Sequence, residues 1–136
     1  FEPISLTSGE SVGIVRFLML DGKPTPEVVD AIESAITWFR AYQINGIRWE
    51  RKNGDSVVTK DKTAPPIWAR FYEMDIMKPI FIGRDAKIKY DVSEIESERR
   101  NGYAWYVTEP GELLEKDYPK WKAKISAGTQ AASLQP

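Results

Sequence analysis

The spacing of the apolar residues changes near residue 45, and this change restricts the chain to folds that combine helices with a separate β region. Before that point apolar residues recur at steps of three and four, whereas after it they alternate with polar residues in short segments. The length of 136 residues fits one domain or part of a larger one. The sequence therefore predicts an α+β fold: a two-helix pair, then a small β-rich region and short C-terminal helices.

The first third of the chain predicts two helices. Residues 8–20 are apolar nearly all round, so we expect this helix to be covered on most sides, with Ser8 as its N-cap. Residues 26–42 follow Thr25 as N-cap and start with Pro26, which the first turn tolerates. Because only a short loop separates the two segments, they predict an antiparallel helix pair.

The β region is predicted from extended segments separated by turns. Asn53-Gly54 lies between two alternating runs and predicts a β-hairpin over residues 47–59. Residues 67–72 and 79–82 are two further extended segments, bounded by Pro and Gly.

The C-terminal third predicts short helices and a tail. Ser93 and Glu96 have the spacing of a capping box, which predicts a short polar helix. A last helical segment over 112–125 is expected to be interrupted near Pro119. Residues 126–136 are small and polar, and predict a flexible tail or linker.

The composition excludes several classes of function. The chain has no Cys and no His, so it offers no thiol nucleophile, zinc finger or histidine base, and a metal would need oxygen ligands. Counts of 19 Lys+Arg and 20 Asp+Glu argue against a general nucleic-acid-binding protein. No apolar run has the length of a membrane span. The absence of Cys is also compatible with a secreted or periplasmic protein.

The segment 67–72 carries the first candidate binding residues. In a regular strand, Trp68, Arg70 and Tyr72 share one face. Such a face suits a sugar acid, because aromatic rings pack against the pyranose and the guanidinium forks onto the carboxylate. The alternative is a half-buried strand whose arginine pairs with a nearby Asp or Glu.

A second candidate region follows Gly83. Arg84, Lys87 and Lys89 place three cations close together, next to Tyr90. Residues 47–90 hold ten Lys/Arg and six Asp/Glu, a net charge of +4, which favours a polyanionic ligand. The alternative is a solvated strand surface balanced by the acidic helices.

The charge run from Glu94 to Arg100 is interpreted as structural. On a helix it allows an i,i+4 pair between Glu96 and Arg100. The carboxylates of the chain nowhere show the spacing of a calcium-binding loop.

Several segments of the chain resemble the C-terminal part of polysaccharide lyase family 10 pectate lyases. The resemblance extends over residues 1–125. The matching runs are FEPISL, SGESVGIVRFLM, TPEVVDAIESAITWF, WARFY, PIFIGRDAKIKYDVSEIESERRNGYAWY and YPKW. It implies that residues 1–125 are the C-terminal part of a catalytic domain, in which the helix pair ends an (α/α)₃ toroid.

The resemblance also implies a chemistry. Family members cleave homogalacturonan by β-elimination, with Ca²⁺ neutralising the carboxylate beside the proton that a base removes. Arg70 in WARFY and Arg84 in GRD resemble the family's substrate-binding arginines. Lys87, Lys89 and Tyr90 in the same run, and Trp68 beside Arg70, are the further substrate-binding candidates.

The resemblance leaves two hypotheses open, since the family's calcium ligands and base belong upstream of Phe1. In the first, the chain is a piece of a pectate lyase that acts with its other half. In the second, it is a non-catalytic module that binds pectate. Polygalacturonate or pectin is the expected ligand, and the missing lyase half or a second copy of the chain is the expected protein partner.

Overall fold

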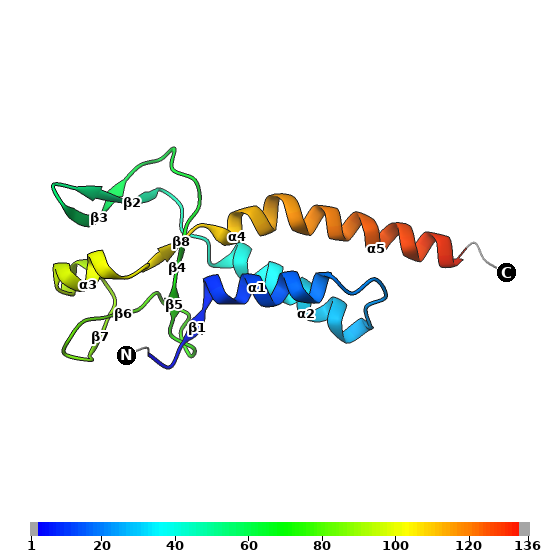
Figure 1. Ribbon diagram of the computed structural model, residues 1–136, viewed down its shortest axis with the longest axis horizontal. Helices are drawn as coiled ribbons and strands as arrows, with labels where there is room; N and C mark the ends of the chain where they lie inside the picture. Colours follow the sequence, from blue (N-terminus) through cyan, green and yellow to red (C-terminus); the bar gives the residue numbers. More distant parts are fainter. Residues whose placement is uncertain (1–2, 134–136) are drawn as a thin grey trace.

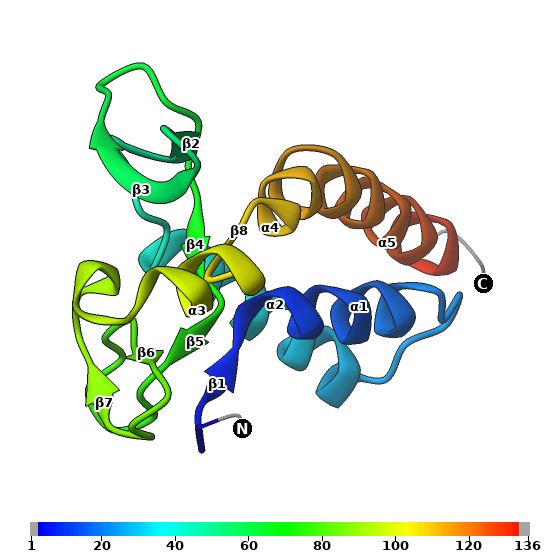
Figure 2. The same ribbon diagram turned by 60° about the vertical axis from the view of Figure 1, so that its left-hand side comes forward.

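The structure of the chain, a computed structural model, describes residues 3–133 and has a helical end and a β-rich end (Figure 1). Helices α1, α2 and α5 lie side by side at one end, and the short strands and α3 form the other (Figures 1 and 2). The predicted mixture of helices and strands is confirmed. None of the helices within residues 3–133 is long and apolar enough to cross a bilayer.

The predicted helix pair is confirmed as α1 (Ser8–Met19) and α2 (Pro26–Ala41), which pack against each other. Thr25 caps α2 as predicted, since its side chain accepts a hydrogen bond from the amide of Val28. Pro26 occupies the first turn, where its missing N–H leaves no helical hydrogen bond unmade.

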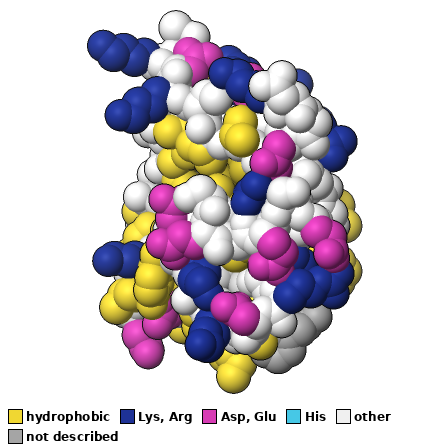
Figure 3. Space-filling view, turned by 90° about the vertical axis from the view of Figure 1, so that its left-hand side faces the viewer, with side chains coloured by type: hydrophobic (Ala, Val, Ile, Leu, Met, Phe, Trp, Pro, Cys, Tyr) yellow, Lys and Arg dark blue, Asp and Glu magenta, His cyan; other side chains and the backbone are white. Residues whose placement is uncertain are grey.

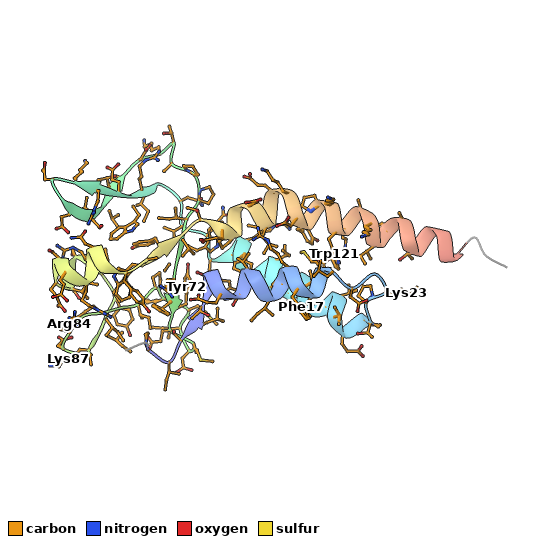
Figure 4. All side chains as sticks on the ribbon, in the orientation of Figure 1. Phe17, Lys23, Tyr72, Arg84, Lys87 and Trp121 are labelled. Atoms are coloured by element: carbon orange, nitrogen blue, oxygen red, sulfur yellow. The ribbon has the colours of Figure 1, made fainter. Side chains whose placement is uncertain are left out.

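Two expectations for α1 were wrong. The N-cap is Thr7, and Ser8 is instead buried, with its hydroxyl donating to the carbonyl of Ala69 at 2.6 Å. The helix is also covered on one side only, because α2 and the C-terminal helix pack on the same face. Ile14 and Phe17 are 63% and 72% exposed, and Phe17 projects away from α5 in Figure 4.

The C-terminal segment is a nearly continuous helix. It comprises α4 (Glu109–Glu112), a π-helical turn η2 (Leu113–Asp117) and α5 (Tyr118–Ser133). The helix is not interrupted at Pro119, which lies in the first turn of α5; the irregularity is the π turn, which ends two residues earlier at Asp117. The predicted flexible tail is helical up to Ser133, and its last three positions lie outside the described residues.

The strands are short and pair in twos. Among residues 3–133 the antiparallel pairs are β1 with β5, β2 with β3, β4 with β8, and β6 with β7. Their bounds are Leu6–Thr7 (β1), Ile47–Lys52 (β2), Asp55–Lys60 (β3), Trp68–Ala69 (β4), Phe71–Tyr72 (β5), Phe81–Ile82 (β6), Ile88–Lys89 (β7) and Tyr106–Val107 (β8).

The β2–β3 hairpin confirms the prediction from Asn53-Gly54. Both turn residues have positive φ, 52° for Asn53 and 77° for Gly54, as a two-residue turn of this kind requires. The register then places Lys52 opposite Asp55 at the turn.

Two hydrophobic clusters support the two ends of the molecule. The helical cluster contains Val12, Val15, Ile32, Ile36, Phe39, Trp68, Leu113 and Trp121. The β-rich cluster contains Phe71, Ile80, Phe81, Ile82, Val92, Ile95 and Trp105. Segment 67–72 contributes to both clusters, so it lies between them.

The predicted capping box does not form. Ser93 lies in a 3₁₀ turn η1 (Val92–Glu94), where its amide donates to the Asp91 carboxylate at 2.9 Å. The polar helix α3 (Ser97–Gly102) begins after Glu96, whose side chain makes no capping hydrogen bond. The Glu96 carboxylate is used elsewhere, as described below.

The helical cluster predicts a contrast between two isoleucines. Ile32→Ala removes a fully buried side chain and should lower the free energy of unfolding by about 2–5 kcal/mol. Ile14→Ala removes an exposed side chain on the same helix pair and should change it by about 0.5 kcal/mol or less. Urea unfolding of both variants measures the difference, and equal losses would contradict the assignment of the core.

Candidate functional site

Arg70 lies at the break between β4 and β5, where the chain passes between the two clusters. Its amide donates to the carbonyl of Trp105 at 2.8 Å, and its carbonyl accepts from the amide of Ser8 at 3.0 Å. The side chain is 23% exposed, and its Nη2 donates to the Glu10 carboxylate at 2.9 Å. Arg70 is therefore fixed at its backbone and paired at one edge of its guanidinium.

The prediction that Trp68, Arg70 and Tyr72 form one ligand-binding face is wrong, because both aromatic rings are buried. Trp68 is fully buried in the helical cluster, and its indole N–H donates to the carbonyl of Phe39 at 2.8 Å. Tyr72 is 1% exposed and its hydroxyl donates to the carbonyl of Tyr42 at 3.0 Å. Burial raises the pKa of Tyr72 to about 12. In this structure both rings are structural, because the segment has a cluster on each side.

The aromatic partner of Arg70 is instead Tyr103, which the sequence analysis missed. The Arg70 guanidinium lies 4.5 Å from the centre of the Tyr103 ring and 5.3 Å from that of Phe71. The Arg99 guanidinium also lies against Tyr103, at 5.4 Å. The sequence signal was two arginines followed closely by two aromatic residues, and it was interpreted as a helix surface only.

The other candidates lie on the β6–β7 hairpin. Arg84 and Lys87 project from its turn at the end of the molecule opposite α5 (Figure 4). Lys89 pairs with Asp85 at 2.9 Å. The Tyr90 hydroxyl donates to Glu73 at 2.5 Å, which raises the pKa of Tyr90. The structure therefore places Arg84, Lys87 and Lys89 on one hairpin, with Tyr90 directly after it.

Two acidic residues from the α3 region hold Arg84. Glu98 forms an ion pair with its guanidinium, and this contact raises the pKa of Arg84 and keeps it cationic. Glu96 accepts a hydrogen bond from its backbone amide, which lowers the pKa of the Glu96 carboxyl. The expected pair of Glu96 with Arg100 is absent, since Arg100 binds Asp55 at 2.6 Å.

Gly83 allows the close approach of Glu96. A Cβ at position 83 would lie 2.7 Å from Oε2 of Glu96, closer than real Cβ atoms come to other groups. The glycine before Arg84 is therefore required for the packing of a carboxylate against the turn.

Three of the four candidate cations already have carboxylate partners. Arg70, Arg84 and Lys89 bind Glu10, Glu98 and Asp85 respectively. Basic and acidic side chains accordingly lie next to one another on this end of the molecule (Figure 3). A ligand carboxylate that binds these cations exchanges places with a carboxylate of the protein.

The calcium ion implied by the family resemblance has no candidate ligands in the described part of the chain. No group of three or more Asp or Glu side chains in residues 3–133 is placed to hold a metal ion. The residues described here therefore do not fit a calcium site, and we assign none of them to metal binding.

Comparison with known proteins identifies the family. The sequence matches the pectic acid lyase family over residues 1–114, which is most of its length, and the chain belongs to that family. No curated protein sequence matches it significantly.

Two similar solved structures are of a family 10 polysaccharide lyase from Cellvibrio cellulosa, one of them a mutant in complex with trigalacturonic acid. Each has a TM-score of 0.73 and 26% sequence identity to this chain, and each match covers 81% of this chain. The match covers 35% of the mutant chain and 34% of the other, so this chain spans about a third of their length.

The contact between Glu96 and the Gly83–Arg84 turn predicts a pH dependence. Because the pKa of Glu96 is lower in the folded protein than its usual 4.5, its stabilising contribution is complete above about pH 4.5 and is lost as the pH falls through the folded pKa. A carboxyl-carbon NMR titration should give a Glu96 midpoint below 4.5.

Two glycine variants test the cause of this shift. Gly83→Ala displaces the carboxylate and should raise the midpoint toward its usual value. Gly13→Ala is the matched control, since a Cβ there meets nothing within 4 Å. A midpoint that stays low in Gly83→Ala would exclude the turn amide as the cause.

Proposed function

We propose that this chain is the pectate-binding part of a pectate lyase, and that Arg70 and Arg84 bind galacturonate carboxylates. The observation that carries the proposal is the placement of these two arginines in a chain of the pectic acid lyase family. One lies at a strand break between two hydrophobic clusters and the other on a turn held by Glu96. Both positions fix the backbone while leaving the guanidinium at the surface.

The chemistry suits a polyanionic sugar. Guanidinium groups bind carboxylates through paired N–H donors, and such charge-assisted hydrogen bonds are stronger than neutral ones. Lys87, Lys89 and Tyr90 belong to the same hairpin and line the same surface as Arg84 in this proposal. Trp68 contributes only by holding the strand that carries Arg70, because its ring is buried.

The reaction that we propose for the complete enzyme is β-elimination on homogalacturonan. A base removes the proton at C5, and the glycosidic bond between C4 and its oxygen then breaks. We assign no base to this chain. The proposal places the base and the calcium ligands in the part of the lyase that these residues do not span. There α1 and α2 would complete an (α/α)₃ toroid, and residues 1–125 would be the C-terminal part of the catalytic domain.

Location and partners follow from the substrate. Because pectate is a polymer outside cells, we propose that the protein acts in a secreted or periplasmic form. Its protein partner in this proposal is the remainder of the lyase, and a second copy of the chain is the alternative.

The competing proposal is a binding module that retains the arginines without catalysis. Two measurements on the purified chain test whether these residues bind pectate and whether they cleave it on their own: retardation in a gel that contains polygalacturonate, and unsaturated product from the same polymer with calcium, followed by ultraviolet absorbance. We expect retardation without product. Product formation would show that the residues of this chain complete the catalytic apparatus, and no retardation would contradict pectate binding.

Arg84 provides a direct test of binding. Arg84→Ala should weaken binding to de-esterified polygalacturonate by about two- to fivefold, because it removes an exposed charge-assisted contact. Arg51→Ala removes the same charge from the exposed β2–β3 hairpin and should leave the affinity unchanged. Affinity gel electrophoresis measures both variants, and an equal effect of the two would assign Arg84 to the general surface charge.

Glu98 provides the opposite test. Glu98→Gln removes the carboxylate that pairs with Arg84, so the guanidinium no longer has to exchange partners, and polygalacturonate should bind about two- to fivefold more tightly. The same gels measure the change, with Glu115→Gln on η2 as a control for the loss of one negative charge. Weaker binding by Glu98→Gln would show that Glu98 supports the site.

A further inference from the structure

The ring of Tyr103 connects two arginines that lie far apart in the sequence. The guanidinium carbon of Arg70 is 4.5 Å from the ring centre and that of Arg99 is 5.4 Å from it. Both distances fall within the range of a cation–π contact. Arg70 comes from the strand break and Arg99 from α3, so the ring joins two elements of the β-rich end.

Arg99 continues this connection to the turn that carries Arg84. Its Nε and Nη2 lie 3.4 and 3.3 Å from the carbonyl oxygen of Ile82, directly before Gly83. The carbonyl of Arg99 in turn accepts the indole N–H of the buried Trp105 at 2.9 Å. Arg99 is thus held at its backbone and reaches the β6–β7 hairpin with its side chain.

A ring and a carboxylate contact different parts of a guanidinium group, so they leave different parts of it free to bind a ligand. A ring occupies the flat face of a guanidinium, whereas a carboxylate occupies the N–H donors at its edge. Tyr103 can therefore restrict the orientation of Arg70 without using the donors that a ligand needs. Restricting a long side chain before binding reduces the entropy lost on binding.

We propose that Tyr103 and Arg99 are positioning residues, which hold Arg70 and the Gly83–Arg84 turn in a fixed relation so that both arginines meet carboxylates of one pectate chain. This inference rests on the proposed function for its ligand. The stack itself is a property of the free protein, so its two parts are tested separately.

The first test uses the free 136-residue chain. In the native protein the side-chain protons of Arg70 should show ring-current shifts, which Tyr103→Leu reduces to the contribution of Phe71 and Tyr103→Phe keeps. Two-dimensional NMR of labelled Arg side chains measures this. Arg70 resonances at ordinary positions, or a shift unchanged in Tyr103→Leu, would overturn the stack whether or not pectate binds.

The second test is a double-mutant cycle with de-esterified polygalacturonate as the probe. Tyr103→Leu should weaken binding about two- to fivefold, as expected for a cation–π contact, and Tyr103→Phe should restore it. In an Arg70→Ala background, Tyr103→Leu should have no further effect, because its role passes through Arg70. Independent, additive losses would overturn the positioning role and leave Tyr103 with a general structural one.

A third variant tests the connection to the turn. Arg99→Lys keeps the charge but lacks the planar guanidinium that reaches the Ile82 carbonyl. It should weaken binding to polygalacturonate in the wild-type background and have little further effect in the Arg84→Ala background. Thermal unfolding of each variant identifies any that are not folded. A native chain that binds no polygalacturonate would overturn the proposed function and this role in binding together, while ring-current shifts in that chain would still establish the stack.

Discussion

The rest of the structure depends on the burial of Trp68. Its side chain is fully covered by the helices, and its indole N–H is satisfied by the carbonyl of Phe39 at 2.8 Å. The backbone of the same strand pairs with β8, and Phe71, three residues later, belongs to the other cluster. This short segment therefore contributes to the cores of both the helical end and the β-rich end, and Arg70 lies at the junction between the two.

Local signals in the sequence were sufficient for elements that depend on neighbouring residues. The cap of α2 at Thr25 and the Asn53-Gly54 turn need only a hydroxyl near free amides and two residues that tolerate positive φ, and both were predicted. Ser8 has the same local chemistry, but long-range packing gave its hydroxyl a partner in the carbonyl of Ala69, whereas Ser93 pairs with the competing local acceptor Asp91. Burial by distant segments cannot be derived from a short pattern.

The same distinction applies to the candidate site. The grouping of Arg84, Lys87 and Lys89 follows from their proximity in the sequence, and the structure places them on one hairpin. The predicted aromatic face around Arg70 failed because alternation distinguishes two faces but does not tell whether both are covered. Tyr103 lies 33 positions from Arg70, and only the tertiary fold brings its ring to the guanidinium.

The pairing of Arg70, Arg84 and Lys89 with protein carboxylates has a consequence for how the proposed binding surface would release a polymer. In the proposed complex, Glu10 or Glu98 is close enough to take the place of a sugar carboxylate that leaves Arg70 or Arg84. Arg70, whose side chain is mostly covered, is then not left without a counter-charge, and an isolated charge that is partly removed from water is the costly state. In the proposed complex, departure of the polymer would therefore have a lower barrier than at a site of bare arginines, and this suits a surface that has to release one stretch of chain before it binds the next.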